Sequence, residues 1–391
     1  MAEPAHVGLT TFPRPATPYE EYMGEEGLPI HRGVSGFSDV RLLDLGDWKR
    51  LGGAGAFIEP EGIGNVQGTY LLKVPAGRAL EPERHLFEEV FFVVEGSGRT
   101  EVWIDDAAPD TVEWQANSVL TVPLNAWHRH IAGRKGDALM IVGSNAPLAM
   151  QLFRNRGFVF GSDYVFSDRY QPGTGYYTPT ALKEHPVNKR ALNSDAFIPD
   201  VTGVEIPLDG QRGAGYRHFE LQMGGNFFDG WVGEYPPGRY SKAHAHESGP
   251  ILICLSGAGY TLAWPKGLGI RPWESGHGDE VVRTDYGPGG LVSAAPGGSD
   301  WFHAHFGASR IPFRAMALSG GFPKRVAGKP GDDATENQDL RTGGDTIGYA
   351  DEDPMIRRMY KETLAAAGVP FDMPEEVYQR DKALTAQTAE R

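Results

Sequence analysis

The second half of the chain holds histidines with the spacing of a metal site. His244 and His246 are separated by one residue, so on a regular strand both imidazoles would point to the same face. His303 follows later in the chain, and from the opposing strand of a barrel it would complete a facial set of three nitrogen donors. Borderline ions such as Fe(II), Zn(II), Ni(II) and Cu(II) accept this ligand set. The pattern therefore predicts one divalent metal ion; the alternative is that these are polar positions in a barrel without metal.

The first half of the chain offers a different set of donors, which includes carboxylates. The set is Glu83, His85, Glu89 and His128. Carboxylate-rich sites suit a hard divalent ion such as Mn(II). The alternative is a barrel that has lost its metal and serves as scaffold, with its carboxylates paired to nearby Arg84 or Arg129. Both interpretations stay open from the residues alone.

Basic and aromatic residues near the histidine pair are candidates for substrate contacts. Arg239 and Lys242 precede the pair, whereas Arg271 and Trp273 follow it in a glycine-bearing stretch. Arginine binds carboxylates through two parallel hydrogen bonds, and tryptophan stacks on aromatic rings. We expect these residues to meet an anionic substrate, with a solvated surface position as the alternative for each. Arg239 also matches Arg78 of the repeat described next, which would fit a shared structural role.

Two segments of the chain can be superimposed without a gap, which reveals an internal repeat. They are VPAGRALEPERHLFEEVFFVVEGSGRTEVW, from Val74, and YPPGRYSKAHAHESGPILICLSGAGYTLAW, from Tyr235. Among the identities in this one frame are the pairs Gly77 and Gly238, His85 and His246, Gly96 and Gly257, Gly98 and Gly259, and Trp103 and Trp264. Each segment is typical of a strand, a turn around the histidine, an apolar strand, a Gly-x-Gly turn and another strand.

A second matched block follows each segment. It reads SVLTVPLNAWHRHIAG from Ser118 and LVSAAPGGSDWFHAHFG from Leu291. This alignment pairs His128 with His303 and favours His303 over His305 as the third ligand, which leaves His305 as a supporting group or proton carrier. The spacing is wider in the second copy, which predicts an insertion, mostly within residues 266–287, near the mouth of a barrel.

The two blocks resemble the two motifs of the cupin superfamily. These motifs are a histidine pair, a glutamate four residues on and a glycine seven further, then a proline-containing turn that leads to a third histidine. The resemblance covers about residues 60 to 145 and 220 to 320. It implies an all-β protein of two double-stranded β-helix, or jelly-roll, barrels, each with its metal site inside the barrel.

Pro250 stands where most cupins place a metal-binding glutamate. Three neutral ligands would leave a bound ion its full double charge and open positions, so such a centre attracts a bidentate anionic substrate. This departure resembles the gentisate and salicylate 1,2-dioxygenases, which are double cupins with a His-x-His pair and no glutamate. Two features differ from that pattern: Phe302 stands between Trp301 and His303, and the complete triad lies in the second barrel instead of the first.

The resemblance implies an Fe(II) dioxygenase that cleaves a hydroxylated aromatic acid or a dicarbonyl-type substrate with O₂ in the second barrel. One alternative is a decarboxylase, isomerase or lyase that uses Mn, Zn or Ni as a Lewis acid. The other is a binding or storage cupin without turnover. Oxygen uptake separates the first hypothesis from the other two, and metal analysis separates the third.

The repeat predicts a chain of five parts. They are an N-terminal arm (1–58), a first barrel (59–150), an inter-barrel region (151–215), a second barrel (216–320) and a C-terminal tail (321–391) with a helix over 354–367. Asp353 as N-cap, Pro354 in the first turn and Gly368 after the last turn predict the limits of that helix. Apolar surface on the arm, the inter-barrel region and the tail suggests a homodimer or a higher homo-oligomer.

Composition excludes several other classes of protein. The chain of 391 residues has a formal charge of −14 and no basic stripe, which argues against a nucleic-acid partner. Cys254 is the single cysteine, so neither an internal disulfide nor a cysteine-based zinc cluster is possible. No apolar run has the length of a membrane span, and the first residues do not have the pattern of a signal peptide. We therefore expect a cytoplasmic protein without membrane contact.

Overall fold

A computed structural model describes residues 15–33, 35–63, 67–186, 189–246, 251–293, 300–319 and 338–379. Strands dominate this part of the chain, which confirms the predicted all-β class. The helices are short and lie outside the sheets: α1 (Pro18–Glu26), α2 (Ala146–Phe153), α3 (Arg156–Gly161) and α4 (Pro354–Ala367). None of the described helices is both long and apolar enough to cross a bilayer.

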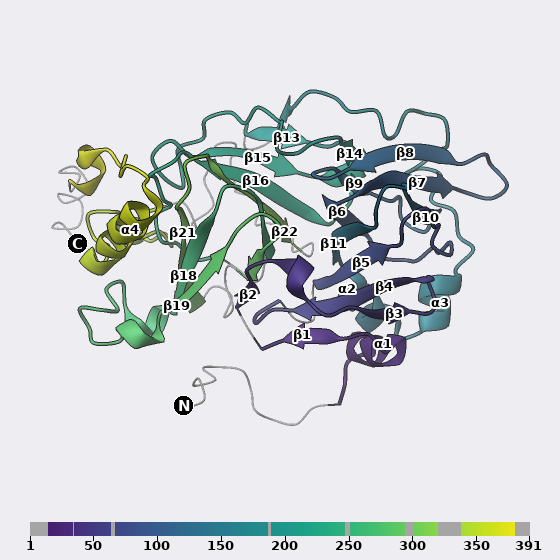
Figure 1. Cartoon of the computed structure of the whole chain (residues 1–391), viewed down its shortest axis with the longest axis horizontal. Coiled ribbons are helices and arrows are strands. Elements are labelled where there is room, and N and C mark those ends of the chain that lie inside the picture. Colours follow the sequence, from purple (N-terminus) through teal and green to yellow (C-terminus); the bar gives the residue numbers. More distant parts are fainter. Residues whose placement is uncertain are drawn as a thin grey trace.

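The first barrel consists of a large and a small sheet (Figure 1). The large sheet has the order β1-β4-β5-β11-β6-β9-β14, with β3 on β4, and the small sheet has the order β10-β7-β8. The strands are β1 (Ile30–Arg32), β3 (Gly46–Trp48), β4 (Gly53–Glu59), β5 (Gly68–Val74), β6 (Glu89–Glu95), β7 (Ser97–Trp103), β8 (Asp110–Gln115), β9 (Val119–Thr121), β10 (Trp127–Ala132), β11 (Ala138–Ser144) and β14 (Phe197–Ile198).

The second barrel repeats this arrangement. Its large sheet has the order β12-β13-β15-β16-β22-β17-β20-β2, and its small sheet has the order β19-β18-β21. The strands are β2 (Gly36–Phe37), β12 (Lys183–Glu184), β13 (Ala191–Asn193), β15 (Arg217–Leu221), β16 (Asp229–Tyr235), β17 (Ile251–Ser256), β18 (Gly259–Pro265), β19 (Val282–Tyr286), β20 (Leu291–Ser293), β21 (Trp301–Gly307) and β22 (Phe313–Ser319). The run β4-β5-β11-β6-β9 thus corresponds to β15-β16-β22-β17-β20.

The two barrels exchange strands at their edges. Strand β2 comes before the first barrel in sequence but pairs with β20 of the second, whereas β14 of the inter-barrel region pairs with β9 of the first. Residues 15–58, expected as an arm, contain α1, β1, β2, β3 and most of β4. Because β4 pairs with β5 from Ala54 to Phe57, this last part of the expected arm lies in the first barrel.

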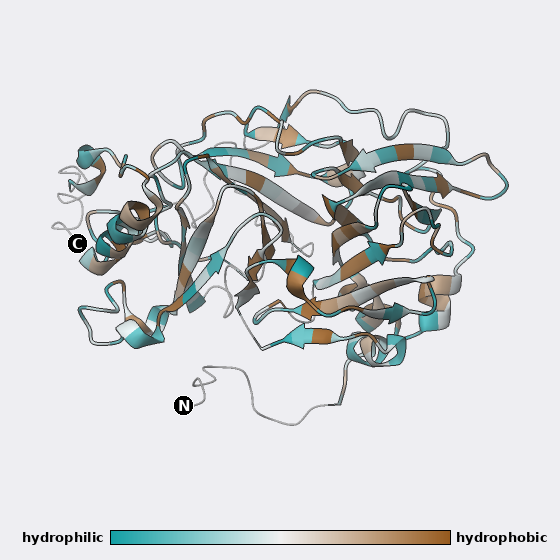
Figure 2. Cartoon of the chain, viewed as in Figure 1, coloured by the Kyte–Doolittle hydropathy of each residue, from teal (hydrophilic) through white to brown (hydrophobic). Residues whose placement is uncertain are grey.

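The large sheets pack against each other through apolar side chains. One buried cluster combines Leu71 and Ile141 of the first barrel with Val232 and Ile253 of the second. Figure 2 shows hydrophobic residues along these central strands. Separate buried clusters fill the barrel interiors. In the second of these, Cys254 is a buried strand residue, and burial raises the pKa of its thiol to about 12, so the thiol stays protonated at neutral pH.

The C-terminal residues cover one side of the second barrel. Asp353 caps α4 by accepting a hydrogen bond from the Met355 amide, and Gly368 ends the helix in the left-handed conformation. The apolar stripe of the helix buries Ile356, Tyr360 and Leu364 in a cluster with barrel residues. The limits of α4 are therefore those that the capping residues predict.

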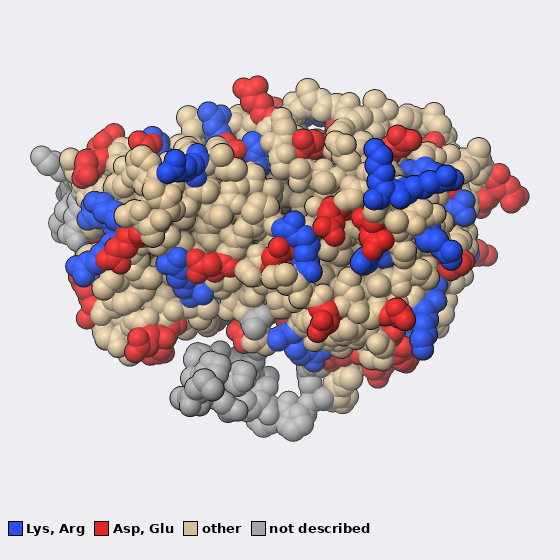
Figure 3. All heavy atoms as spheres, viewed as in Figure 1, with Lys and Arg blue, Asp and Glu red and all other residues tan. Residues whose placement is uncertain are grey.

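The added residues of the second barrel lie in one loop. The expected range of 266–287 includes β19, but β19 pairs with β18 as β8 pairs with β7 in the first barrel. The extra residues therefore lie between β18 and β19, and we call residues 266–281 the insertion loop. This loop lies at the same end of the molecule as α4 (Figure 1). Positive and negative side chains intersperse over the visible face, which shows no basic stripe (Figure 3).

Candidate metal centres

The second-barrel histidines come from β21 and from the segment that faces it. His303 and His305 are two residues apart on β21. His244 is bonded to the same strand: its amide donates to the His303 carbonyl at 2.9 Å, and the His303 amide donates to the His244 carbonyl at 2.8 Å. This pair of bonds places the two side chains next to each other, as the spacing predicts.

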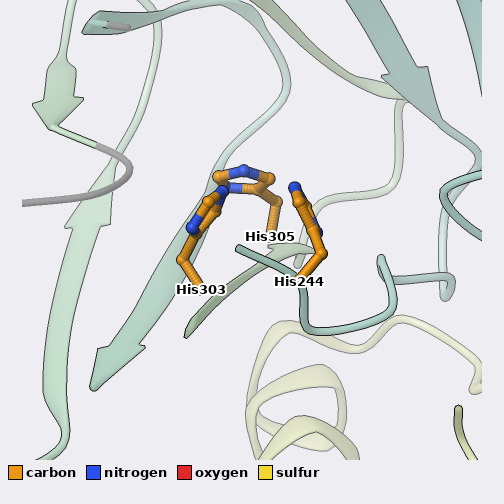
Figure 4. Close-up of side chains that lie close together, drawn as sticks. All are labelled: His244, His303 and His305. Atoms are coloured by element: carbon orange, nitrogen blue, oxygen red, sulfur yellow. The ribbon is translucent and has the colours of Figure 1, made fainter. Parts of the chain in front are cut away.

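The imidazoles of His244, His303 and His305 converge inside the barrel (Figure 4). One ring nitrogen of each residue lies within 4.8 Å of one from each of the others. All three residues are at most 2% exposed. Small adjustments of the rings would bring donors within this limit to ordinary metal–nitrogen distances from a shared ion.

His246, the remaining predicted ligand, lies at the edge of the same group. Its ring centroid is 4.6 Å from that of His303 and 5.7 Å from that of His244. The residue is partly exposed, unlike the other three. The structure thus brings all four predicted histidines together, with His303 near the middle, and the tightest group contains His305. Pro250, at the position of the usual glutamate, lies outside the described residues.

Hydrogen bonds fix the ring orientation of two of these histidines. The Nδ1 atom of His244 lies 2.9 Å from the Lys242 carbonyl, so Nδ1 carries the proton and Nε2 is left with a lone pair. The Nδ1 atom of His305 lies 2.9 Å from the Thr261 hydroxyl, which is also 3.0 Å from the Tyr286 hydroxyl. In metal-binding histidines, a hydrogen bond to one ring nitrogen fixes the orientation of the ring, so that the other nitrogen faces the metal.

The His303 ring is the strongest structural sign of a missing partner. It is fully buried, and neither ring nitrogen has a hydrogen bond within the described part of the chain. A buried polar atom without a partner costs about 1–3 kcal/mol. A divalent cation bound by the grouped imidazoles would offset that cost, so the residues present fit a metal ion.

The electrostatics keep these imidazoles neutral. Burial lowers the pKa of His244 and of His303 well below the ordinary value, and the charge of Arg212 and the neighbouring histidines lower it further. Burial, followed by Arg212, lowers the pKa of His305 to about 3. Neutral imidazoles offer lone pairs and repel a cation less than protonated ones, so at neutral pH the group is ready to bind metal.

The first barrel holds a second group at the matching positions. Glu83, His85 and His128 also have ligand atoms within 4.8 Å of one another. The amide of Glu83 donates to the His128 carbonyl at 3.0 Å and that of His128 donates to the Glu83 carbonyl at 2.9 Å, as in the His244–His303 pair. Glu89 joins the group, because its carboxylate is 3.1 Å from His85 Nε2.

In each member of this first group, one polar side-chain atom is hydrogen-bonded to a residue outside the group. Arg50 donates to Glu83 at 2.6 Å and Tyr70 donates to Glu89 at 2.6 Å. The Nδ1 atoms of His85 and His128 lie 2.9 and 3.2 Å from backbone carbonyls. Nε2 of His85 and Oε2 of Glu89 face each other, whereas Nε2 of His128 is buried without a hydrogen bond in the described part of the chain. These residues also fit a divalent ion, with a mixed oxygen and nitrogen ligand set.

The charges in the first group are balanced by the protein itself. Burial would raise the pKa of Glu83, but Arg50, followed by His85, outweighs it and lowers that pKa. Burial would likewise lower the pKa of His85, but the carboxylates of Glu89 and Glu83 raise it instead. The first group is therefore a set of paired charges, whereas the second is a set of neutral rings.

The first group has almost no free space beside it. Tyr19 and Tyr22 of α1, together with Arg50 and Phe87, line a cavity of about 10 Å³ that also borders Glu83 and Glu89. A volume of this size holds roughly one water molecule. The mouth of the first barrel is thus closed by side chains of the expected N-terminal arm.

The predicted substrate residues are placed mainly against the C-terminal segment. Arg239 pairs with Asp372 at 2.9 Å. Arg271 pairs with Glu274 and donates to the Asp351 carbonyl.

The other two predicted substrate residues differ in their surroundings. The indole of Trp273 is partly buried in the cluster that packs against α4. Lys242 is partly buried beside the histidine pair, and burial lowers the pKa of its amine. Their contact with a substrate, like that of Arg239 and Arg271, stays a prediction.

Arg212 is the residue near the second centre that the sequence analysis did not identify. Its carbonyl accepts a bond from the Lys242 amide at 2.8 Å, and in the first barrel Leu51, next to Arg50, accepts the equivalent bond from Glu81. Each barrel therefore receives an arginine from the loop before its first long strand. The signal in the sequence is weak: a Gly-Ala-Gly stretch follows each arginine, at 53–55 and 213–215.

Matching topology, matching hydrogen bonds and matching donor positions in the two halves decide the architecture. It is a double cupin. No protein-family model matches the sequence, and no curated protein matches it either.

Solved structures that resemble the fold include bicupin proteins. A variant of Bacillus subtilis oxalate decarboxylase is 10% identical, with a TM-score of 0.45 over 82% of this chain and 87% of that chain. A structure from work on the Mn(II) centres of the same enzyme is 10% identical, with a TM-score of 0.44 over 72% and 76% of the two chains. The 7S globulin of Momordica charantia is 14% identical, with a TM-score of 0.42 over 68% and 78%.

Proposed function

We propose that the second barrel is the active site of a metal-dependent dioxygenase that cleaves a hydroxylated aromatic acid or a dicarbonyl-type substrate. The observation that carries this proposal is the buried group of neutral histidines, which contains no carboxylate among the residues that the structure describes. Three neutral ligands leave a divalent ion its full charge and open coordination positions. This combination favours a substrate that binds through two oxygens, one of them anionic.

His244, His246 and His303 would hold the ion. When bound, Fe(II) would supply Lewis acidity and an electron path between the substrate and O₂; Mn, Zn and Ni are the other ions compatible with this site. The protein's own part is to keep the imidazoles of His244 and His303 neutral through burial, and to orient that of His244. The carbonyl of Lys242 fixes the His244 ring by accepting a hydrogen bond from Nδ1.

His305 is suited to orient a substrate hydroxyl close to the reacting atoms. Its Nδ1 is fixed by Thr261, and its low pKa keeps it neutral. A neutral imidazole can accept a hydrogen bond from a substrate hydroxyl and so help to place that hydroxyl beside the ligands. His130 makes the same bond to Thr100 in the first barrel at 2.8 Å, so the hydroxyl support itself belongs to the fold.

Positive charge near the histidines supports an anionic substrate. Arg212 lies close enough to lower the pKa of His244, His303 and His305. Lys242, beside the histidine pair, adds a second cation. Both charges would attract a carboxylate toward the grouped histidines, and arginine can bind a carboxylate through two hydrogen bonds.

The direct test is oxygen consumption by protein loaded with Fe(II) under anaerobic conditions. We expect O₂ uptake with a member of a panel of hydroxybenzoates and β-dicarbonyl compounds, and none with the His303→Ala protein. Loss of CO₂ or isomerisation without O₂ uptake would replace this proposal by non-oxidative metal catalysis. Purified protein that takes up no metal in the second barrel would instead indicate a binding or storage role.

A pair of variants tests whether His246 or His305 binds the metal together with His244 and His303. The repeat matches His246 to His85, which belongs to the first-barrel group, and this supports His246 as the ligand. His246→Ala should therefore lose most of the bound metal, about 10-fold to 100-fold in affinity, whereas His305→Ala should keep the metal and lose turnover. Mass spectrometry measures the metal content of both variants, and O₂ uptake measures their turnover. The reverse pattern would make His305 the third ligand.

A further inference from the structure

Residues 338–353 form a segment that pairs with the strand of His244; we call it the C-terminal strap. The Ala245 amide donates to the Asp345 carbonyl at 3.0 Å, and the Ile347 amide donates to the Ala243 carbonyl at 2.7 Å. Thr346 therefore lies opposite His244 in an antiparallel bridge. The strap adds a short strand beside a metal-ligand position of the second barrel.

His244 is consequently held on both edges of its strand. Its own amide and carbonyl bond to His303 on β21, while its neighbours Ala243 and Ala245 bond to the strap. Bonds on one edge alone would leave the segment free to twist about that edge. Bonds on both edges fix the direction in which the His244 imidazole leaves the backbone.

The same strap holds the insertion loop. At the beginning of the loop, the Lys266 ammonium group pairs with the Asp345 carboxylate at 2.7 Å. Further along, the Arg271 guanidinium donates to the Asp351 carbonyl at 3.0 Å. Asp345 thus bonds to the ligand strand through its carbonyl and to the loop through its side chain.

Asp353 is the point where loop, strap and helix α4 meet. One carboxylate oxygen accepts from the amides of Trp273 and Glu274 at 2.9 and 3.1 Å. The other oxygen accepts from the Met355 amide at 2.9 Å and caps α4. The residue is 1% exposed. A buried carboxylate that satisfies amides of two separate elements fixes their relative position.

We propose that Asp353 is a positioning residue for the second metal centre, acting through the strap on His244. Fixing the loop and the start of α4 to one carboxylate anchors the end of the strap, and the anchored strap holds the far edge of the ligand strand. Loosening this anchor widens the range of His244 orientations, so the metal leaves faster. The inference rests on the metal site of the proposed function and is independent of the reaction catalysed there.

Two substitutions separate this role from that of a helix cap. Serine at the N-cap keeps a hydroxyl that accepts from the Met355 amide, but it has no second oxygen for the loop amides, whereas alanine has neither. Asp353→Ala and Asp353→Ser should therefore both release metal about tenfold faster. The thermal midpoint should fall mainly in Asp353→Ala. Asp372→Asn, which removes an exposed carboxylate of the same C-terminal region, is the matched control and should release metal at the wild-type rate.

The measurement is Zn(II) release from loaded full-length protein to a chromophoric chelator, with the His303→Ala protein as the blank for any first-barrel metal. Hydrogen exchange of residues 243–246 and of the insertion loop is followed in parallel, and both should exchange faster in Asp353→Ser. Lys266→Met, which removes a different side-chain contact between loop and strap, should show a smaller change in the same direction and serves if the Asp353 variants do not fold.

Wild-type Zn(II) release from folded Asp353→Ser, or from Lys266→Met in its place, would overturn the inference. Should the second barrel take up no Zn(II) at all, the proposed function would fail first, and the exchange of residues 243–246 in the metal-free proteins would then decide the inference by itself. Unchanged exchange there in Asp353→Ser would overturn it, whereas faster exchange would support the restraint on His244.

Discussion

The two barrels present the same backbone positions to two different kinds of chemistry. In the first barrel, Glu83 faces His128 and is paired with Arg50. In the second, His244 faces His303 and no built-in carboxylate stands at this position. Two differences in the repeat, Glu83 against His244 and Glu89 against Pro250, therefore separate a centre of paired charges from a centre of neutral rings.

The arginines of the two barrels show the consequence of this difference. Arg50 and Arg212 lie in corresponding loops of the two barrels. The carbonyl of Leu51, next to Arg50, accepts a bond from the Glu81 amide, and the carbonyl of Arg212 accepts the equivalent bond from the Lys242 amide. Arg50 donates to Glu83, and the charge of Arg212 lowers the pKa of the second-barrel histidines. We propose that a substrate carboxylate approaches Arg212 in the second barrel as Glu83 approaches Arg50 in the first.

The barrels also differ in what closes them. Tyr19 and Tyr22 of α1 fill the space beside the first group, leaving a cavity of about 10 Å³. The second barrel has instead the insertion loop and the C-terminal strap, which are joined to each other through hydrogen bonds at Asp353. The first centre therefore has little room for a substrate, whereas the second is bordered by a strap that holds its ligand strand.

The largest expected difference between the barrels is in the response to losing the central ligand. His303→Ala should remove most second-barrel metal and all turnover, because the remaining imidazoles bind a divalent ion too weakly. His128→Ala, the matched change in the first barrel, should keep turnover within about twofold and cost about 1–3 kcal/mol of stability. Metal content, turnover and urea unfolding measured on both proteins check this. Loss of turnover in folded His128→Ala, with activity kept in His303→Ala, would exchange the roles of the barrels.

A smaller difference is expected on acidification of the metal-free protein. The pKa values of His244, His303 and His305 lie below the unfolded value of 6.5. The unfolded chain therefore binds protons first, and the stability that these groups contribute is complete above pH 6.5 and is lost as the pH falls. Each buried histidine costs up to about 1.4 kcal/mol per pH unit in this range.

The first barrel should lose less over the same range. Among the described histidines of the first barrel, only His128 and His130 have lowered pKa values. The pKa of His85 is raised, so its contribution is complete below pH 6.5 and is lost only as the pH rises through its folded value. Hydrogen exchange at about pH 7 and about pH 5.5, corrected for intrinsic rates, should show more loss of protection in β21 than in β10. Equal loss in both strands would remove the electrostatic contrast between the barrels.

The repeat made the barrels predictable from the sequence. The apolar runs at 90–94 and 251–255 become β6 and β17, and the Gly-x-Gly turns lead into β7 and β18. The pairing of His128 with His303 is confirmed by their identical backbone bonds to Glu83 and His244. Local patterns of this kind are strong because burial and turn chemistry act within a few residues.

Contacts between distant parts of the chain were not predictable in the same way. Strand β2 has only two residues, and it pairs with β20 far along the chain. The partner of Trp273 is Asp353, which the sequence identifies as a helix cap but not as an acceptor for the insertion loop. Arg212 lies in a glycine-bearing turn well before His244, so no motif connects the two. Such contacts depend on how the barrels pack, and they leave no repeating pattern in the nearby sequence.

The smallest of the expected effects concerns Arg212 and the binding of the substrate. Removing its charge in Arg212→Gln should raise KM for an anionic substrate about tenfold, equal to about 1.4 kcal/mol, because the carboxylate loses a charged partner. The kcat value and the metal content should change little, since Arg212 is not among the grouped ligands. Arg99→Gln is the matched control, because Arg99 is an exposed arginine of the first barrel that pairs with Glu101, and its loss should leave KM within about twofold. Steady-state kinetics at two ionic strengths checks this, and the KM of Arg212→Gln should depend less on salt than that of the wild type. An unchanged KM in Arg212→Gln would mean that the positive charge near the second centre serves the protein and not the substrate, as Arg50 does in the first barrel.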